Sequence, residues 1–226
     1  MKREKQMVSR TFSCLMGIYI ACLLLSNLIA GKMMLIGCVT LPAAVILFPV
    51  TYILGDVFTE VYGYKNMRVV IWTGFACSAF AVIVYMITIL LPHPEFWEGQ
   101  DAFKTVLSTT PRVFAASLVG YLFGEFSNSM ILSKLKVKTQ GRFLWVRTIL
   151  STVVGEAFDT IIFISISFWG TMDTQVLLQM MLYQYLFKVC YEIVFTPLTY
   201  LVVNKLKRIE GVDTFDNVTS YNPFNE

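Results

Sequence analysis

Long apolar stretches separated by short polar segments make up most of the chain. A helix needs about 20 mostly apolar residues to cross a hydrocarbon core about 30 Å thick. Six stretches meet this requirement, so the pattern predicts an all-α, polytopic membrane protein built as a bundle of six transmembrane helices. The predicted spans run approximately over Thr11–Gly31, Leu41–Tyr62, Val69–Leu91, Val113–Leu132, Thr148–Gly170 and Val176–Asn204.

Basic residues fall mainly on alternate connecting segments. Fourteen Lys and Arg lie on segments that would share one side of the membrane, against three on the other side. Because Lys and Arg collect in cytoplasmic loops, this bias predicts that both termini face the cytoplasm. The chain then divides into a basic N-terminus over 1–10, a single transmembrane domain over 11–204 and a cytoplasmic tail over 205–226.

The sequence also supports separate expectations for the first apolar stretch, the outer loop and the C-terminal tail. The first apolar stretch follows a basic start, but it is too long for a cleaved signal peptide and further apolar stretches follow at once, so we expect a retained helix. The outer loop Pro92–Pro111 contains acidic and aromatic residues and is expected to hold a short interfacial helix. The tail after Arg208 is polar and acidic, and we expect it to be mobile.

Composition agrees with a lipid environment. Only 15% of residues are charged and mean hydropathy is +0.65, whereas a soluble domain carries about 25% charged residues. The five cysteines lie in apolar stretches without a CxxC spacing, and the single histidine, His93, lies in an outer loop, so neither a metal site nor a disulfide framework is expected. No cofactor is indicated. The basic loops explain the net charge without a nucleic-acid partner.

Ionisable residues inside the predicted spans carry the chemical information, because such groups are costly in hydrocarbon and usually face a bundle interior or a water-filled cavity. Tyr52, Asp56 and Glu60 in the second span are four residues apart and share one helix face. Glu60 either belongs to this set or caps the helix near the inner headgroups. Pro49 is expected to kink this helix.

The fourth span repeats small and polar residues at the same interval. Gly120 and Gly124 are expected to let another helix approach closely. Asn128 follows four residues later and can both donate and accept hydrogen bonds, while Glu125 lies one position off the stripe.

The fifth and sixth spans add acids and one cation near mid-depth. Glu156 and Asp159 are three residues apart and lie on the same face of their helix. Gln184, Lys188 and Glu192 form another four-residue stripe, in which Lys188 either pairs with Glu192 or holds acids of other helices. Since acids outnumber the single lysine, some of them must be protonated, hydrated or waiting for a ligand that donates hydrogen bonds.

Several long motifs together resemble those of the queuosine precursor transporters, a family earlier grouped with vitamin uptake transporters of unknown substrate. The resemblance covers most of the chain from 48 to 200 and implies a six-helix bundle in the bacterial cytoplasmic membrane. It also implies import of the cyano- and aminomethyl-deazaguanine precursors of queuosine for tRNA modification. The motifs lie over Phe48–Gly63, Arg68, Ile71–Trp72, Gly124–Phe126, Asn128–Ser129, Leu132–Lys136, Thr139, Gly141–Arg142, Leu144–Trp145, Arg147–Ile149, Ser151–Thr152, Gly155–Glu156, Asp159 and Lys188.

The polar residues suit such a substrate. A guanine-like base presents an N–H and an exocyclic amine side by side, and one carboxylate can accept both. Asp159 and Glu156 are the first candidates for this role and Asp56 is the next. Asn128 or Gln184 could bind the ring carbonyl, and Lys188 could hold the acids in place when no substrate is bound. Glu125 and Glu192 are the further acidic candidates of the site. The aromatic residues that could stack on the base are Phe48, Tyr52, Trp72 and Phe163.

The alternative function is that of a substrate-binding subunit of an energy-coupling-factor importer for another vitamin or nucleobase-like solute. Such subunits also have six helices, and their fold would be similar to the one expected here. The first span lacks their alanines four apart, which favours a carrier that works alone. The chain has no phosphate-binding GxxxxGK[ST] loop, DDxxD run or GxSxG elbow, so we do not expect an enzyme. A homo-oligomer is compatible with the sequence.

Overall fold

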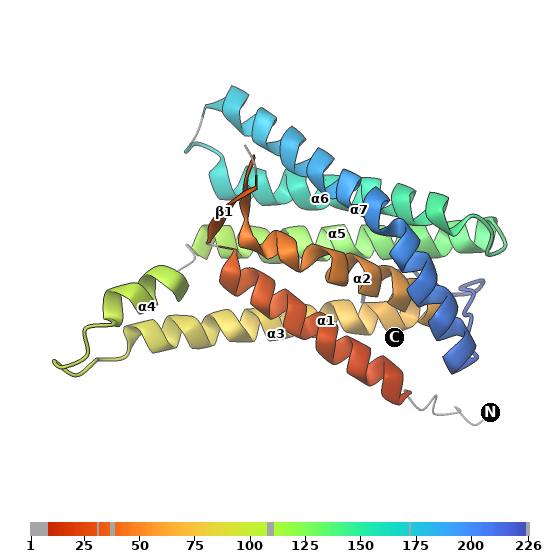
Figure 1. Cartoon of the computed structure of the whole chain (residues 1–226), viewed down its shortest axis with the longest axis horizontal. Helices are drawn as coiled ribbons and strands as arrows, with labels where there is room; N and C mark the ends of the chain where they lie inside the picture. The colour runs from red at the N-terminus through yellow and green to blue at the C-terminus, as the bar shows by residue number, and fades with distance from the viewer. Residues whose placement is uncertain (1–8, 31, 37–38, 108–110, 172, 225–226) are drawn as a thin grey trace.

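The computed structural model describes residues 9–30, 32–36, 39–107, 111–171 and 173–224. Helices dominate the described residues, and one short β-hairpin interrupts them (Figure 1). In chain order the elements are α1 (Arg10–Ile29), β1 (Met33–Ile36), β2 (Val39–Pro42), a 3-10 turn η1 (Ala43–Ile46), α2 (Phe48–Tyr62), α3 (Tyr64–Leu90), α4 (Gln100–Leu107), α5 (Pro111–Lys138), α6 (Leu144–Phe168) and α7 (Thr174–Glu210).

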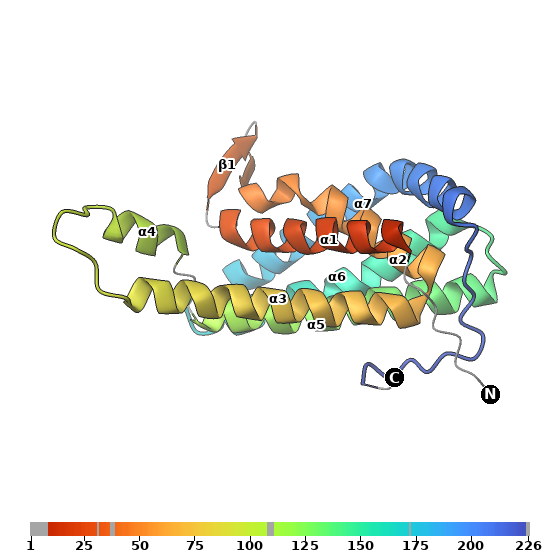
Figure 2. The same cartoon turned by 90° about the horizontal axis from the view of Figure 1, so that it is seen from below.

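The six longer helices run back and forth along one direction (Figures 1 and 2). The start of α1, the α2–α3 and α5–α6 connections and the end of α7 lie at one end of the bundle, called the inner end below. The β-hairpin, α4 and the α6–α7 turn lie at the opposite, outer end. Among the described helices, α1, α3, α6 and α7 are each long and apolar enough to cross a membrane, and so is the stretch Gln100–Lys138, which ends in α5. The prediction of an all-α polytopic membrane protein is confirmed.

The predicted second span is not one continuous helix. Instead of a helix from Leu41 to Tyr62, the chain forms β2 and η1 before α2 begins at Phe48. Pro49 lies in the first turn of α2, where its missing N–H costs no hydrogen bond, so it starts the helix and does not kink it. With 15 residues, α2 is about 22 Å long and shorter than a hydrocarbon core.

Glycines bring α5 and α6 into close contact. A Cβ atom on Gly124 would lie 2.9 Å from the Asp159 Cβ, and one on Gly155 would lie 2.8 Å from the Asn128 Cβ. Neither position has room for a side chain, so the two backbones approach as the glycine stripe predicts. This contact places Asp159 of α6 level with Gly124 and Asn128 of α5 level with Gly155, about one helical turn apart along the bundle.

The C-terminal segment after α7 packs against the inner end, contrary to the expectation of a mobile tail. The backbone N–H of Thr214 donates to the carbonyl of Val61 at 3.1 Å. The Asp216 carboxylate accepts hydrogen bonds from the Tyr64 backbone N–H at 2.8 Å and from the Ser133 hydroxyl at 2.6 Å. Residues of α2, α3 and α5 therefore bind this segment. In the outer loop, α4 is the short helix that the sequence predicts.

Candidate functional site

Lys188 lies in the middle of α7 and bridges the two acids of α6. Its Nζ atom is 2.6 Å from Glu156 Oε2 and also contacts Asp159 Oδ2. The lysine is buried, and both acids are mostly covered. Glu156 and Asp159 therefore face α7 together, as their spacing predicts. The ion pairs of Lys188 are with these two acids of α6 and not with Glu192 of its own helix.

Asp56 of α2 and Glu192 of α7 form a second acidic pair beside this one. Their side chains are only 1% and 2% exposed, and Glu192 is the strongest charged neighbour of Asp56. The Asn128 amide donates to Asp56 Oδ1 at 3.4 Å. In the described part of the chain, Asp56 Oδ2, Glu192 Oε1 and Asn128 Oδ1 have no hydrogen-bond partner.

Glu125 of α5 approaches the same region from another side. Its Oε2 atom lies 3.6 Å from where a Cβ on Gly55 of α2 would stand, and it too lacks a partner among the described residues. Tyr19 of α1 lies close to the Glu125 carboxylate, and its buried hydroxyl has no hydrogen-bond partner among the described residues. Glu125 therefore belongs to the acidic groups inside the bundle.

The predicted aromatic and amide residues divide between two places. Phe48 stacks on Tyr52 with ring centroids 5.8 Å apart, and Tyr52 lies close to Glu156. Phe163 packs on α5 at Gly120. Gln184 lies one turn before Lys188 on α7 and is half-buried.

Trp72 instead contacts the C-terminal segment. Its indole N–H donates to the Pro223 carbonyl at 3.0 Å, and its ring lies 5.5 Å from that of Phe224. The other indole contacts that the structure records are with Phe75 and Phe126. Trp72 thus packs with the tail and not with the acidic groups.

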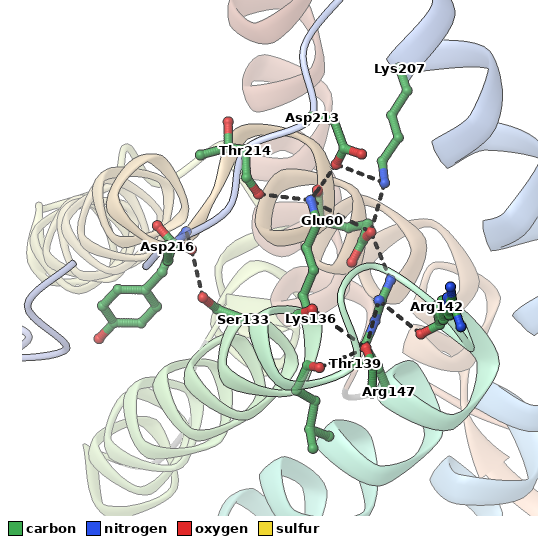
Figure 3. Close-up of polar contacts among 12 residues, drawn as sticks. Glu60, Ser133, Lys136, Thr139, Arg142, Arg147, Lys207, Asp213, Thr214 and Asp216 are labelled. Carbon is green, nitrogen blue, oxygen red and sulfur yellow. Dashed lines mark hydrogen bonds and ion pairs between the residues drawn. The ribbon is translucent and has the colours of Figure 1, made fainter. Parts of the chain in front are cut away.

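A separate ion-pair cluster, absent from our sequence predictions, lies at the inner end (Figure 3). Glu60 is 1% exposed, and its Oε1 atom accepts from Arg147 Nη2 and Lys207 Nζ, each at 2.8 Å, with Lys136 Nζ at 3.7 Å. Asp213 of the C-terminal segment contacts Lys136 and lies 2.9 Å from Lys207 Nζ. Glu60 therefore joins α2 to α5, α6 and α7.

The polar interior has two layers of different charge. In the inner layer, Lys136, Arg147 and Lys207 pair with Glu60 and Asp213, so the cations of this cluster outnumber the two acids with which they pair. Among the described residues of the middle layer, Lys188 is the one basic group that forms ion pairs. Several carboxylate oxygens there have no hydrogen-bond partner. The middle layer, defined by Asp56, Glu125, Asn128, Glu156, Asp159, Lys188 and Glu192, is the candidate binding site.

Two cavities of about 290 and 170 Å³ lie at the outer end, away from the middle layer. The larger one is lined by the end of α3, the following loop and α4, and includes His93, Trp97 and Phe103. The smaller one lies at the α6–α7 turn beside Trp169 and Leu177. Neither is lined by residues of the middle layer.

Comparison with known proteins identifies relatives of the chain. Residues 42–202 match a family described as "Putative vitamin uptake transporter". The chain is 29% identical over 146 residues to a "Probable queuosine precursor transporter" of Bacillus subtilis (strain 168), a match that spans 64% of each protein. It is 26% identical over 163 residues to the "Queuosine precursor transporter" of Escherichia coli (strain K12), covering 70% of this chain and 71% of the relative.

A third relative, a "Probable queuosine precursor transporter" of Haemophilus influenzae, is 26% identical over 165 residues and is matched over 68% of its length. No solved structure matches the chain. The family match runs from the residue before η1 to the last third of α7, so it includes every residue of the middle layer.

Proposed function

The chain belongs to the vitamin uptake transporter family, and on that premise we propose that it imports the deazaguanine precursors of queuosine across the bacterial cytoplasmic membrane. The proposed substrates are the cyano- and aminomethyl-deazaguanine bases. As a member of a transporter family with a multi-pass membrane fold, the chain is not an enzyme. The names of the three relatives support queuosine precursors as the transported class.

One observation carries this proposal: acids of α2, α5 and α7 each bury a carboxylate oxygen that receives no hydrogen bond from the described residues. Asp56, Glu125 and Glu192 each have a buried carboxylate oxygen with no partner among the described residues. A buried acceptor is costly unless it is hydrogen-bonded, so a ligand rich in N–H groups offsets that cost. The precursors offer N–H groups in two places: a ring N–H beside an exocyclic amine on the Watson–Crick edge and, in the aminomethyl base, the amine of the side chain.

Lys188 and the aromatic residues beside the middle layer suit the rest of the base. The Phe48–Tyr52 stack provides aromatic faces next to Glu156, and a flat heterocycle can pack on such a face. Lys188 keeps Glu156 and Asp159 paired when no base is bound, and its ammonium can donate to the ring carbonyl when one of these acids turns to the base.

Substrate access requires the helices to move. Because Asp56 and Glu192 are almost fully covered, a solute reaches them only when the surrounding helices separate at one end or the other. At the inner end, the ion-pair cluster of Glu60 holds four helices together and so opposes opening toward the cytoplasm.

The test is uptake of labelled deazaguanine bases by bacteria that cannot synthesise them, with and without this gene. We expect uptake to depend on the gene, and Asp159→Asn to abolish it while leaving the protein in the membrane. Glu95→Gln, in the exposed outer loop, serves as the matched control with normal uptake. Equal uptake in cells with and without the gene would overturn the proposed function.

Purified protein in liposomes separates this carrier from an ATP-driven importer. Uptake into liposomes that contain the chain alone, without ATP, is the expected result. A protonophore added to the same vesicles shows whether a proton gradient drives the uptake.

A further inference from the structure

The single lysine of the middle layer neutralises only part of it. Lys188 forms its ion pairs with Glu156 and Asp159. Within the described ranges, no Lys or Arg lies within ion-pair distance of Asp56 or Glu192. The cations of the inner layer are taken by Glu60 and Asp213. The middle layer therefore has one half with a cation and one half without.

The unpaired polar atoms of the half without a cation are carboxylate and amide oxygens. Asp56 Oδ2, Glu192 Oε1 and Asn128 Oδ1 are buried and have no partner among the described residues. Asp56 connects them, because it accepts from the Asn128 amide and has Glu192 as its strongest charged neighbour. Since the Asn128 amide nitrogen donates to Asp56, the unpaired oxygen of the same amide group also lies close to that carboxylate.

A protonated primary amine is the group that fits these three acceptors. It carries three N–H donors and no acceptor, and its positive charge offsets two buried carboxylates. A nitrile has a nitrogen acceptor, no hydrogen to donate and no charge, so it would leave all three oxygens without partners. Of the two proposed substrates, only the aminomethyl base carries such an amine.

We propose that Asp56, Glu192 and Asn128 form a subsite for a protonated primary amine, and that this subsite makes the chain take the aminomethyl base in preference to the cyano base. This inference rests on the proposed function, which it refines by naming the residues that discriminate between the two precursors. The Lys188 half of the middle layer then binds the part of the base that both precursors share.

The experiment compares the two bases in the same cells. Labelled aminomethyl-deazaguanine uptake is competed with unlabelled aminomethyl or cyano base, and we expect the cyano base to compete about tenfold more weakly or worse. Asp56→Asn and Glu192→Gln keep the shape of each side chain and remove its charge. Each is expected to lower aminomethyl uptake about tenfold or more and to change cyano uptake about twofold or less.

Two further variants frame the result. Asp56→Glu keeps the charge and is expected to keep the preference for the aminomethyl base, although with slower uptake. Glu95→Gln in the exposed outer loop is expected to change neither uptake nor preference. Membrane abundance of each variant is measured by immunoblot, and the competition assay on the unmodified chain supplies the answer if a variant fails to fold.

The outcomes separate this inference from the proposed function. Equal competition by the two bases in the unmodified chain overturns the inference and leaves the proposed function standing. Equal loss of both uptakes in Asp56→Asn and Glu192→Gln also overturns it, since that result assigns the pair to a coupling ion such as Na⁺ or H⁺. No gene-dependent uptake of either base overturns the proposed function itself.

Discussion

At the scale of single residues, Lys188 illustrates how one buried cation organises two acids. Its ammonium contacts Glu156 and Asp159 on the neighbouring helix, and all three side chains are mostly or fully covered. Removing one partner of a buried ion pair leaves charge without compensation and typically costs about 3–5 kcal/mol. The interaction therefore contributes to folding as well as to the proposed site.

Lys188→Met is accordingly expected to lower the melting temperature in detergent and to abolish uptake of both bases. The double variant Lys188→Met with Asp159→Asn is expected to melt higher than Lys188→Met alone, because one uncompensated carboxylate is then removed. Fluorescence-detected size-exclusion chromatography after heating measures the melting temperatures of the single and the double variant. A melting temperature of Lys188→Met equal to that of the unmodified chain would contradict the ion pairs of Lys188 with Glu156 and Asp159.

Glu60 provides a second residue-scale prediction. Its carboxylate receives Arg147 and Lys207 at 2.8 Å from two different helices. Glu60→Gln leaves these cations facing a neutral amide, so we expect a loss of stability of about 3–5 kcal/mol. Adding Arg147→Met is expected to restore part of it, whereas Glu98→Gln in the exposed outer loop is expected to be neutral. Strictly additive effects of Glu60→Gln and Arg147→Met would argue against a direct contact.

At the scale of helices, the α5–α6 contact depends on the absence of side chains. A Cβ on residue 124 would stand 2.9 Å from the Asp159 Cβ and 3.3 Å from the Gly155 carbonyl oxygen. Gly124→Ala must push the helices apart, at a cost typical of overpacking, about 1–3 kcal/mol. Because Asp159 lies at this contact, uptake is expected to fall as well.

Gly17 of α1 is the matched control, since nothing lies within 4 Å of a Cβ added there. Gly17→Ala is expected to be neutral or to stabilise the protein by up to about 1 kcal/mol through helix propensity. Thermal melting of both variants in the same detergent checks the pair. A larger loss for Gly17→Ala than for Gly124→Ala would contradict the described packing.

The long helices could be predicted from the sequence because apolar length is a local property. Hydropathy predicted α1, α3, α5, α6 and α7, but it could not detect that the stretch before Phe48 forms a hairpin and a 3-10 turn. Apolar residues suit a buried strand as well as a helix, and periodicity alone does not separate the two over so short a segment. Pro49 was a better signal for a helix start than for a kink.

The site could be predicted only in part. Helix spacings of four for Asp56 with Tyr52 and of three for Glu156 with Asp159 placed these acids on interior faces, because helix periodicity is fixed. Which cation meets which acid depends on how helices rotate against each other, and that follows from packing that the sequence does not state. Lys188 therefore had several possible partners, and the structure assigns it to Glu156 and Asp159.

At the scale of the whole molecule, the C-terminal segment closes the inner end by returning over α2, α3 and α5. Its contacts include Asp216 with Tyr64 and Ser133, and the carbonyl of Asn222 with Arg68 at 2.9 Å. A polar, acidic segment after the last helix has the composition of a mobile tail. The basic inner end of the bundle, which the sequence does show, is the complementary surface that holds it.

An ion pair at the inner end also makes the stability of the fold depend on pH in the acidic range. Burial raises the pKa of the Asp213 carboxyl, but hydrogen bonds from Lys136 and Lys207 outweigh it and hold the pKa below its ordinary value. A carboxylate with a lowered pKa in the folded state stabilises the fold fully above its unfolded-state pKa, about 3.9 for Asp, and this contribution disappears as pH falls through the lowered value.

Asp213→Asn should therefore melt below the unmodified chain at neutral pH and approach it in acid. Since the side chain is 45% exposed, solvent screens its ion pairs and the difference is expected to be small. Melting of both proteins from about pH 7 to about pH 3 measures it, and the gap should stay constant until the pH drops below about 4. A gap that closes already near neutral pH would mean that another group, and not the Asp213 carboxylate, holds the C-terminal segment to Lys136 and Lys207.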